Sequence, residues 1–365
     1  MAWTPSTVLD ATTLNDRFKV KTDPLKERSV MMAGMESNGR IEYNAEGENV
    51  EWRPEIRTRE ITAANPYRVR MSFPSRNVWM KATLGWSTYN LGERIAKVDR
   101  LANKGDAAFF NLVDKVVDGM SRDFVKELPK KFYIDGSSYP EDLQGLESIY
   151  SVDGLVSSGY VGDPDGTYAG NSQALGALGG SWDSTGVWPH LGVGTNDYSA
   201  WSPMVVDYQA ALWTSYAAHT ITSAVWAQTW RVAMNFLYLN MGRIRDMAPD
   251  VCILHTELLR QAEDTLQSTE RFEVTANSDL TKLGHKTVQW KGIELAHEFA
   301  CPSAVGYMFS WDNLTLKSMQ SQLVGYENDH KIESSDDIYA ADFYGQLIIE
   351  IPGYMGKLAA VTAGS

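Results

Sequence analysis

The residues best suited to metal chemistry lie between positions 285 and 302. His297-Glu298 begins like the zinc-protease motif HExxH, in which two histidines one helical turn apart hold the metal. Cys301 stands where the second histidine should be, and Pro302 follows it in a segment whose pattern predicts a strand instead of a helix. His285, His297 and Cys301 also match no structural zinc spacing. We therefore predict no metal site.

Other motifs of catalysis or ligand binding are incomplete. Asp163-Pro-Asp-Gly166 matches the first half of a calcium loop, but Ala174 stands where the twelfth position needs a glutamate, so the segment predicts a turn. The chain has no GxSxG nucleophile elbow and no P-loop, and the glycine-rich stretch 176–194 does not follow a strand and open a helix. Carboxylates are abundant, so a glycosidase acid pair stays open, although no two of them stand out. We predict no catalytic residue and no cofactor.

The composition narrows the class of protein. The 365 residues include 46 acidic and 33 basic side chains, a net charge of -13, which argues against a nucleic-acid reader with a basic face. Long apolar runs and an export signal are absent from the sequence, so we predict no membrane span and no secretion. Cys252 and Cys301 are too few for a disulfide framework and indicate reduced thiols in a cytosolic setting. The 12 Trp and 17 Tyr serve either a sugar-binding cleft or large buried interfaces.

The N-terminal part of the chain predicts elements that have no core of their own. Residues 1–38 show no sustained hydrophobic period and predict an arm that lies on another surface. From 39 to about 61 the pattern is extended, with a polar turn over 44–49 and then charges at alternate positions. This two-residue period predicts a strand with one ionic edge. We predict a long, highly charged hairpin that either projects into solvent or packs on another chain.

Segments with a hydrophobic face follow. Apolar residues recur at three- and four-residue steps from 105 to 128, which predicts a long helix that Pro129 ends. Residues 151–200 predict a long surface excursion, and 208–245 predicts a second helical region. From 249 onward the pattern predicts a compact α/β unit and return strands near the end of the chain. Its elements are a helix at 257–267 and strands at 251–254, 286–290, 293–295, 306–311, 314–317, 345–351 and 357–361.

Residues 249–365 also carry a specific series of short segments. They are Cys252-Ile-Leu-His-Thr-Glu-Leu-Leu-Arg260, Gln289-Trp-Lys-Gly-Ile293, the Cys301-Pro302 step before Gly306-Tyr-Met-Phe309, Gly345-Gln-Leu347 and Gly356-Lys-Leu-Ala-Ala360. Together with the arm, the charged hairpin and the long helix, this series resembles the major capsid proteins of tailed double-stranded-DNA bacteriophages. That fold is shared with encapsulins and with the floor domains of herpesvirus capsids. The resemblance rests on the order of the elements, and 151–200 is its least typical part.

The resemblance implies an α+β capsid fold with defined parts. Residues 1–38 would be the N-terminal arm, and 39–66 an extended β-hairpin called the E-loop. A peripheral domain would comprise 67–150, with a spine helix at 105–128, and the return strands of 331–365. Residues 201–330 would form an axial α/β domain, and 151–200 is a Gly- and Trp-rich insertion.

The resemblance further implies assembly in place of catalysis. Copies would form the hexamers and pentamers of an icosahedral or prolate head around double-stranded DNA, first in the host cytoplasm and then as part of the virion. Portal, scaffolding and decoration proteins would be partners, and the DNA would be contacted without sequence specificity. The expected intersubunit contacts of the E-loop are Glu51, Trp52, Arg53, Glu55, Arg57, Arg59 and Glu60.

Two features of the sequence refine this expectation. Some members of the fold join an E-loop lysine to an asparagine of a neighbour, but 39–66 contains no lysine, so we expect a shell without crosslinks. Because Met1 directly precedes the arm, we expect a separate scaffold or none, in place of a cleaved leading segment.

Two other functions stay open. An encapsulin-type nanocompartment would hold protein cargo in place of DNA, and a carbohydrate-active enzyme would explain the Trp density. Since no catalytic constellation supports the enzyme, we predict that Trp52 and the Trp residues between 182 and 230 serve in packing and subunit contacts.

Overall fold

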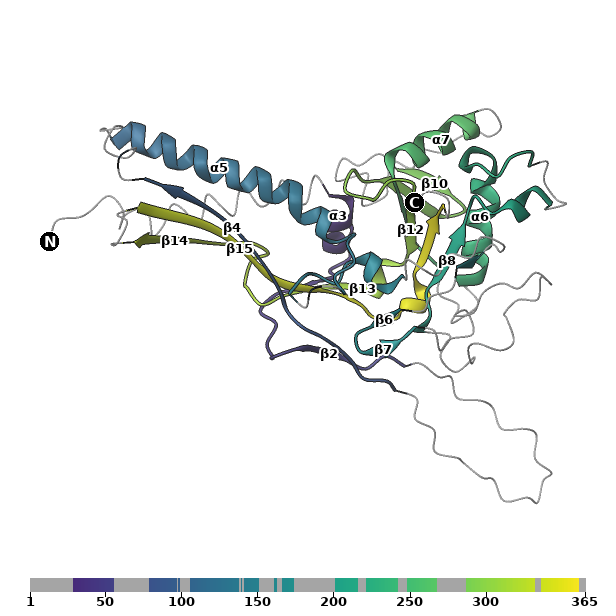
Figure 1. Ribbon diagram of the computed structural model, residues 1–365, viewed down its shortest axis with the longest axis horizontal. Helices are drawn as coiled ribbons and strands as arrows, with labels where there is room; N and C mark the ends of the chain where they lie inside the picture. Colours follow the sequence, from purple (N-terminus) through teal and green to yellow (C-terminus); the bar gives the residue numbers. More distant parts are fainter. Residues whose placement is uncertain are drawn as a thin grey trace, which may run out of the picture.

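The protein has two lobes and two hydrophobic cores, one of which extends from one lobe into the other. The computed structural model describes residues 29–55, 79–96, 98, 106–137, 139, 141–150, 161–162, 166–173, 201–215, 221–241, 248–267, 287–331 and 336–360. Figure 1 shows an elongated lobe, in which the helix α5 lies along a narrow sheet, and a second lobe that contains α6, α7 and another sheet. No helix in these ranges is both long and apolar enough to cross a bilayer.

The elongated lobe is built on a five-stranded sheet. Its strands are β1 (Ile41–Glu42), β4 (Ser87–Ile95), β13 (Leu314–Ser318), β14 (Gly325–Lys331) and β15 (Asp336–Ile349). The long β15 changes partners along its length: its first part pairs with both β14 and β4, and its last five residues pair with β13. The short β1 then adds to β13 in parallel. One strand thereby connects the outer end of the lobe to the centre of the molecule.

The helix α5 (Asp106–Lys131) covers this sheet, with contacts to β4 and β15. Met120, Phe124 and Leu128 of the predicted apolar stripe are buried. The expected end before Pro129 is wrong, because the helix continues to Lys131 with Pro129 inside its last turn. The final turn tightens there: the Phe132 N–H donates to the Pro129 carbonyl at 3.2 Å, and Lys130 and Lys131 stand at the negative end of the helix dipole.

The second lobe contains a seven-stranded sheet in the order β10-β11-β9-β12-β16-β8-β5. The strands are β5 (Val161–Gly162), β8 (Met204–Asp207), β9 (Val251–Leu254), β10 (Val288–Trp290), β11 (Ile293–His297), β12 (Gly306–Phe309) and β16 (Gly356–Ala359). The helices α6 (Trp226–Met241) and α7 (Thr256–Gln267) pack against each other and on this sheet. The strand at 251–254 and the helix that follows it are confirmed within one residue.

Side-chain alternation makes this sheet a wall between two cores. Val251 and Ile253 of β9 belong to the core that also contains α5 and β15 residues. Cys252 and Leu254 belong to the core under α6 and α7. Successive residues of a strand point to opposite faces, so four consecutive buried residues serve both cores. The two lobes are therefore parts of one body.

The division of the chain expected from the sequence differs from this topology. Strands β13 and most of β14 fall inside 201–330 but pair in the sheet of the elongated lobe. Strand β16 falls inside 331–365 but is inserted between β12 and β8 in the other lobe. The helical region expected at 208–245 contains α6 and the 3-10 helix Ala211–Ser215, and it is preceded by strand β8. The cause is long-range strand pairing, which no local period records.

Residues 30–37 also depart from the expected arm. They form α3 (Val30–Ser37), whose residues Val30 to Met35 are all buried. Ser29 caps this helix, since its hydroxyl accepts a hydrogen bond from the Met32 N–H at 3.3 Å. Only 1–28, which lie outside the described residues, remain as a possible extent for the arm. The remaining short elements are the hairpin β6 (Thr167–Tyr168) and β7 (Asn171–Ser172) and the 3-10 helices Leu146–Ile149, Trp311–Asn313 and Pro352–Tyr354.

Candidate intersubunit surface

A two-stranded ribbon forms the base of the charged extension. Strand β2 (Val50–Trp52) pairs in antiparallel register with β3 (Ala82–Leu84), so its partner lies some thirty residues further along the chain. The hairpin expected inside 39–61, with its turn at 44–49, is therefore wrong. Ile41 and Glu42, its supposed first strand, are β1 and pair with β13. The boundary expected at 66 falls outside the described residues.

The ribbon closes at a defined point. After Trp52 the pairing is interrupted by Pro54, which has no N–H to donate, and it resumes in a single bridge between Glu55 and Trp79. The Met80 N–H donates to the Pro54 carbonyl at 3.1 Å. Glu55 and Trp79 therefore flank residues 56–78, which lie outside the described residues. That span contains five arginines, a single acidic residue and no lysine, in a chain whose net charge is -13.

Four of the seven expected contact residues lie at this base. Glu51 points to the solvent side and pairs with Lys81, with 2.7 Å between Nζ and Oε1. Trp52, Arg53 and Glu55 line a groove on the other side. The remaining three, Arg57, Arg59 and Glu60, lie outside the described residues.

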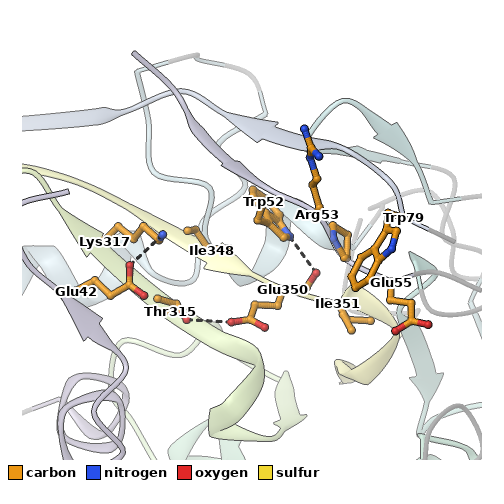
Figure 2. A pocket seen from close by; sticks show the side chains of 11 residues that line it. Glu42, Trp52, Arg53, Glu55, Trp79, Thr315, Lys317, Ile348, Glu350 and Ile351 are labelled. Atoms are coloured by element: carbon orange, nitrogen blue, oxygen red, sulfur yellow. Dashed lines mark hydrogen bonds and ion pairs between the residues drawn. The ribbon is translucent and has the colours of Figure 1, made fainter. Parts of the chain in front are cut away.

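The groove is an open cavity of about 350 Å³ between the ribbon and one face of the five-stranded sheet (Figure 2). The Trp52 indole N–H donates to the Glu350 carbonyl at 3.1 Å and fixes the ribbon to the sheet. Lys317 and Glu42 form an ion pair at 2.9 Å on the floor. Trp79 is 51% exposed at the ribbon end of the groove. A half-exposed Trp beside charged groups is a composition typical of protein contact surfaces.

The same groove offers little to an enzyme. Of its three carboxylates, Glu42 and Glu350 are exposed and Glu55 is half-buried, so none has the full burial that a general acid of a glycosidase uses. No cluster of three or more His, Cys, Asp or Glu residues able to hold a metal occurs within the described part of the chain. His297 ends strand β11, whereas Cys301 is buried in the turn that follows, so the strand expected around Cys301 and Pro302 is wrong. His285 and 163–165 lie outside the described residues.

The tryptophans between 201 and 230 are packing residues. Trp201, Trp213, Trp226 and Trp230 are at most 3% exposed. Two of them tie α6 to α7: the Trp226 indole N–H donates to the Leu258 carbonyl, and that of Trp230 to the Thr265 hydroxyl, each at 2.8 Å. They present no surface to a neighbour or a sugar. Trp182 and Trp188 lie outside the described residues.

Trp79 and Lys81 are candidate contact residues that the sequence analysis does not single out. Both belong to the second limb of the ribbon, which sequence reasoning left in the peripheral domain. The sequence does mark Trp79 as a surface residue, because it ends the largely polar run Ser75-Arg-Asn-Val-Trp79 and has few apolar residues beside it. The second limb also brings a lysine, Lys81, to the base of the extension, where Glu51 engages it.

Comparisons with known proteins give matches among solved structures only. No protein-family model and no curated protein matches the chain. A chain of the cyanophage A-1(L) capsid asymmetric unit matches with a TM-score of 0.59 at 12% identity, over 91% of this chain and 92% of that one. The capsid of a native GTA particle matches with a TM-score of 0.50 at 8% identity, over 91% and 92%. At such low identity, these structural matches establish the fold alone: the chain has the major capsid fold of tailed phages.

Proposed function

We propose that this chain is the major capsid protein of a tailed double-stranded-DNA phage. The observation that carries the proposal is the agreement of fold over nine-tenths of both chains with a cyanophage capsid subunit. Copies assemble into hexamers and pentamers, and these close an icosahedral or prolate head around the genome. In this role the protein is structural and not an enzyme, and its locations are the host cytoplasm during assembly and the virion afterwards.

The extension that starts at the ribbon is the proposed clasp between subunits. Its base is fixed by Trp52, and its five arginines give it a charge opposite to that of the chain as a whole. Opposite charge steers copies together and disfavours wrong pairings. Exposed ion pairs contribute about 0–1 kcal/mol each, so single contacts break readily and a misplaced subunit can leave. Many such contacts in a closed shell then add up to durability.

The finer parts of the proposal concern partners and covalent chemistry. Portal, scaffolding and decoration proteins are the proposed partners, and the packaged DNA is contacted without sequence readout. The shell is proposed to be free of lysine–asparagine crosslinks, since 39–66 has no lysine and Lys81 is paired at the base. A ladder of covalent multimers on a denaturing gel of mature particles would contradict this.

Negative-stain microscopy of the purified chain tests the proposal. Closed shells or ring-shaped capsomers are expected, whereas a monodisperse monomer over a wide range of salt and protein concentration would refute assembly. A shell from a native source that protects DNA from nuclease supports the phage head. A shell of one small diameter that holds protein and no DNA supports the second candidate, an encapsulin-like compartment, which shares the fold.

A further inference from the structure

A buried carboxylate joins three parts of the fold. Glu298, in the turn after β11, is 4% exposed. The Ser29 hydroxyl donates to its Oε1 at 2.5 Å, and the Tyr133 hydroxyl donates to its Oε2 at 2.5 Å. Oε2 also accepts the Met31 N–H at 3.2 Å. One side chain therefore holds the first turn of α3, the segment just after α5 and the turn that leaves the seven-stranded sheet.

No cation balances this carboxylate among the described residues that surround it. The titratable groups nearest to it are Tyr133 and Cys301, and behind them lie Tyr307, Tyr150, Glu147 and Lys357. Lys357 already pairs with Glu147, with 2.5 Å between Nζ and Oε2. His297, the preceding residue, packs its ring edge-on to the exposed Phe299. Among the described residues, an ionised Glu298 is therefore held only by two hydroxyl dipoles and the positive end of α3.

This environment favours the neutral acid. Loss of hydration raises the pKa of Glu298, and the hydrogen bonds from Ser29, Tyr133 and Met31 oppose the rise without cancelling it. The carboxyl group in the closed junction thus binds its proton more tightly than the same group in water. By linkage, the closed junction is most stable below the pKa of a hydrated glutamate, and it loses stability as the pH rises toward the raised pKa.

We propose that Glu298 makes the junction of α3 with the two lobes proton-dependent, closed most firmly when the carboxyl is protonated and loosened when it ionises. The device belongs to the single subunit. It therefore goes beyond shell formation, and either proposal can fail while the other stands.

Cys301 reports on the opening of this junction. It is 3% exposed, and its N–H donates to the Glu298 carbonyl at 3.2 Å. A buried thiol reacts with a disulfide reagent only during local opening. The other cysteine, Cys252, lies within β9 and is removed by Cys252→Ala, so that a single thiol remains. Dipyridyl disulfide serves as the reagent, because it reacts at acidic as well as neutral pH.

The test compares this single-thiol chain with the same chain carrying Glu298→Gln, from pH 4 to 8. At each pH, the labelling rate of the parent single-thiol chain is divided by that of the Glu298→Gln chain. This ratio cancels the effect of ionisation of the thiol itself. The ratio is expected to rise with pH by up to about tenfold per unit above the ordinary glutamate pKa and then to level off. A flat ratio, or one that falls as the pH rises, overturns the proposal.

Two further variants complete the experiment. Ser29→Ala removes a hydrogen-bond donor to the ionised form of Glu298 and so raises its pKa further. The labelling rate is therefore expected to level off at a higher pH than in the parent chain. If Glu298→Gln does not fold, Ser29→Ala serves as the test by itself. If the labelling rate of Ser29→Ala depends on pH in the same way as that of the parent chain, the proposed role of Glu298 at the junction is contradicted. Glu93→Gln removes an exposed carboxylate on β4, outside both the groove and the contacts of Glu298, and is expected to follow the parent chain at every pH.

Discussion

Two helical glycines give opposite predictions for the same substitution. A Cβ added to Gly34 of α3 would overlap the indole of Trp311, with Cε2 at 2.7 Å and two ring carbons closer still. Trp311 is 6% exposed and packs edge-on against Phe309 at 5.2 Å, so the ring has no free space to turn into. A Cβ added to Gly119 of α5 would meet nothing within 4 Å.

The magnitudes follow from packing and helix propensity. Overpacking a buried site costs about 1–3 kcal/mol, and this overlap with a trapped ring belongs at the upper end. Alanine recovers about 1 kcal/mol of helix propensity at either position. Gly34→Ala should therefore destabilise the subunit by about 2 kcal/mol, and Gly119→Ala should stabilise it by about 0.5–1 kcal/mol. The two variants differ by about 3 kcal/mol, more than a hundredfold in the folding equilibrium.

Urea unfolding measures both variants, at protein concentrations where no assembly is detected, because assembly stabilises the folded state by mass action. Gly119→Ala serves as the matched control for propensity. A Gly34→Ala chain as stable as the parent would show that α3 does not pack on Trp311 as described. A destabilised Gly119→Ala chain would refute the open surroundings of α5 at that position.

Three further substitutions test the junction and the ribbon. Lys357→Met leaves the half-buried carboxylate of Glu147 with the Tyr307 hydroxyl but without its ion-pair partner. It should cost about 2–3 kcal/mol in urea unfolding, and adding Glu147→Gln should recover much of that loss. Trp79→Ala removes a half-exposed ring, so the unfolding free energy should change by less than about 1 kcal/mol while sedimentation velocity shows a smaller assembled fraction; unchanged assembly would contradict the contact role. Lys81→Met breaks an exposed ion pair with Glu51 and should change the unfolding free energy by less than about 1 kcal/mol. The difference from the parent chain should shrink as salt is added, because salt screens the pair in the parent chain.

Local hydrophobic periodicity predicts those helices and strands that can be recognised without knowing which other elements they pack against. The stripe through Met120, Phe124 and Leu128 marks a helix whatever it packs on, and all three are buried under α5. The apolar run at 251–254 marks a strand because buried strands lack polar positions. Its two-faced burial was not predictable, since a run without alternation does not tell which residue faces which core.

Pairing between distant strands was beyond local reasoning. Nothing near Gly356 indicates that its strand lies between β12 and β8, because the register is decided by residues 48 and 152 positions away. The same limit applies to the candidate contact surface. Glu51 and Trp52 stand out through their own composition, whereas Trp79 and Lys81 gain their place only when β3 pairs with β2. The alternating charges after residue 50 predict one continuous strand, whereas Pro54 interrupts the hydrogen-bonded ladder of the ribbon.

The shared sheet also indicates where the subunit can change shape. Since Val251 and Ile253 serve one core while Cys252 and Leu254 serve the other, a displacement of the lobes cannot pass through β9 without unpacking both. The hydrogen-bonded ladder of seven strands resists the same movement. Among the described residues, the lobes also meet in polar contacts at Glu298, which is buried, and at Glu147, which is half-buried. Polar contacts can be exchanged for water at lower cost than a packed core, so we expect a change in the angle between the lobes to begin at this junction.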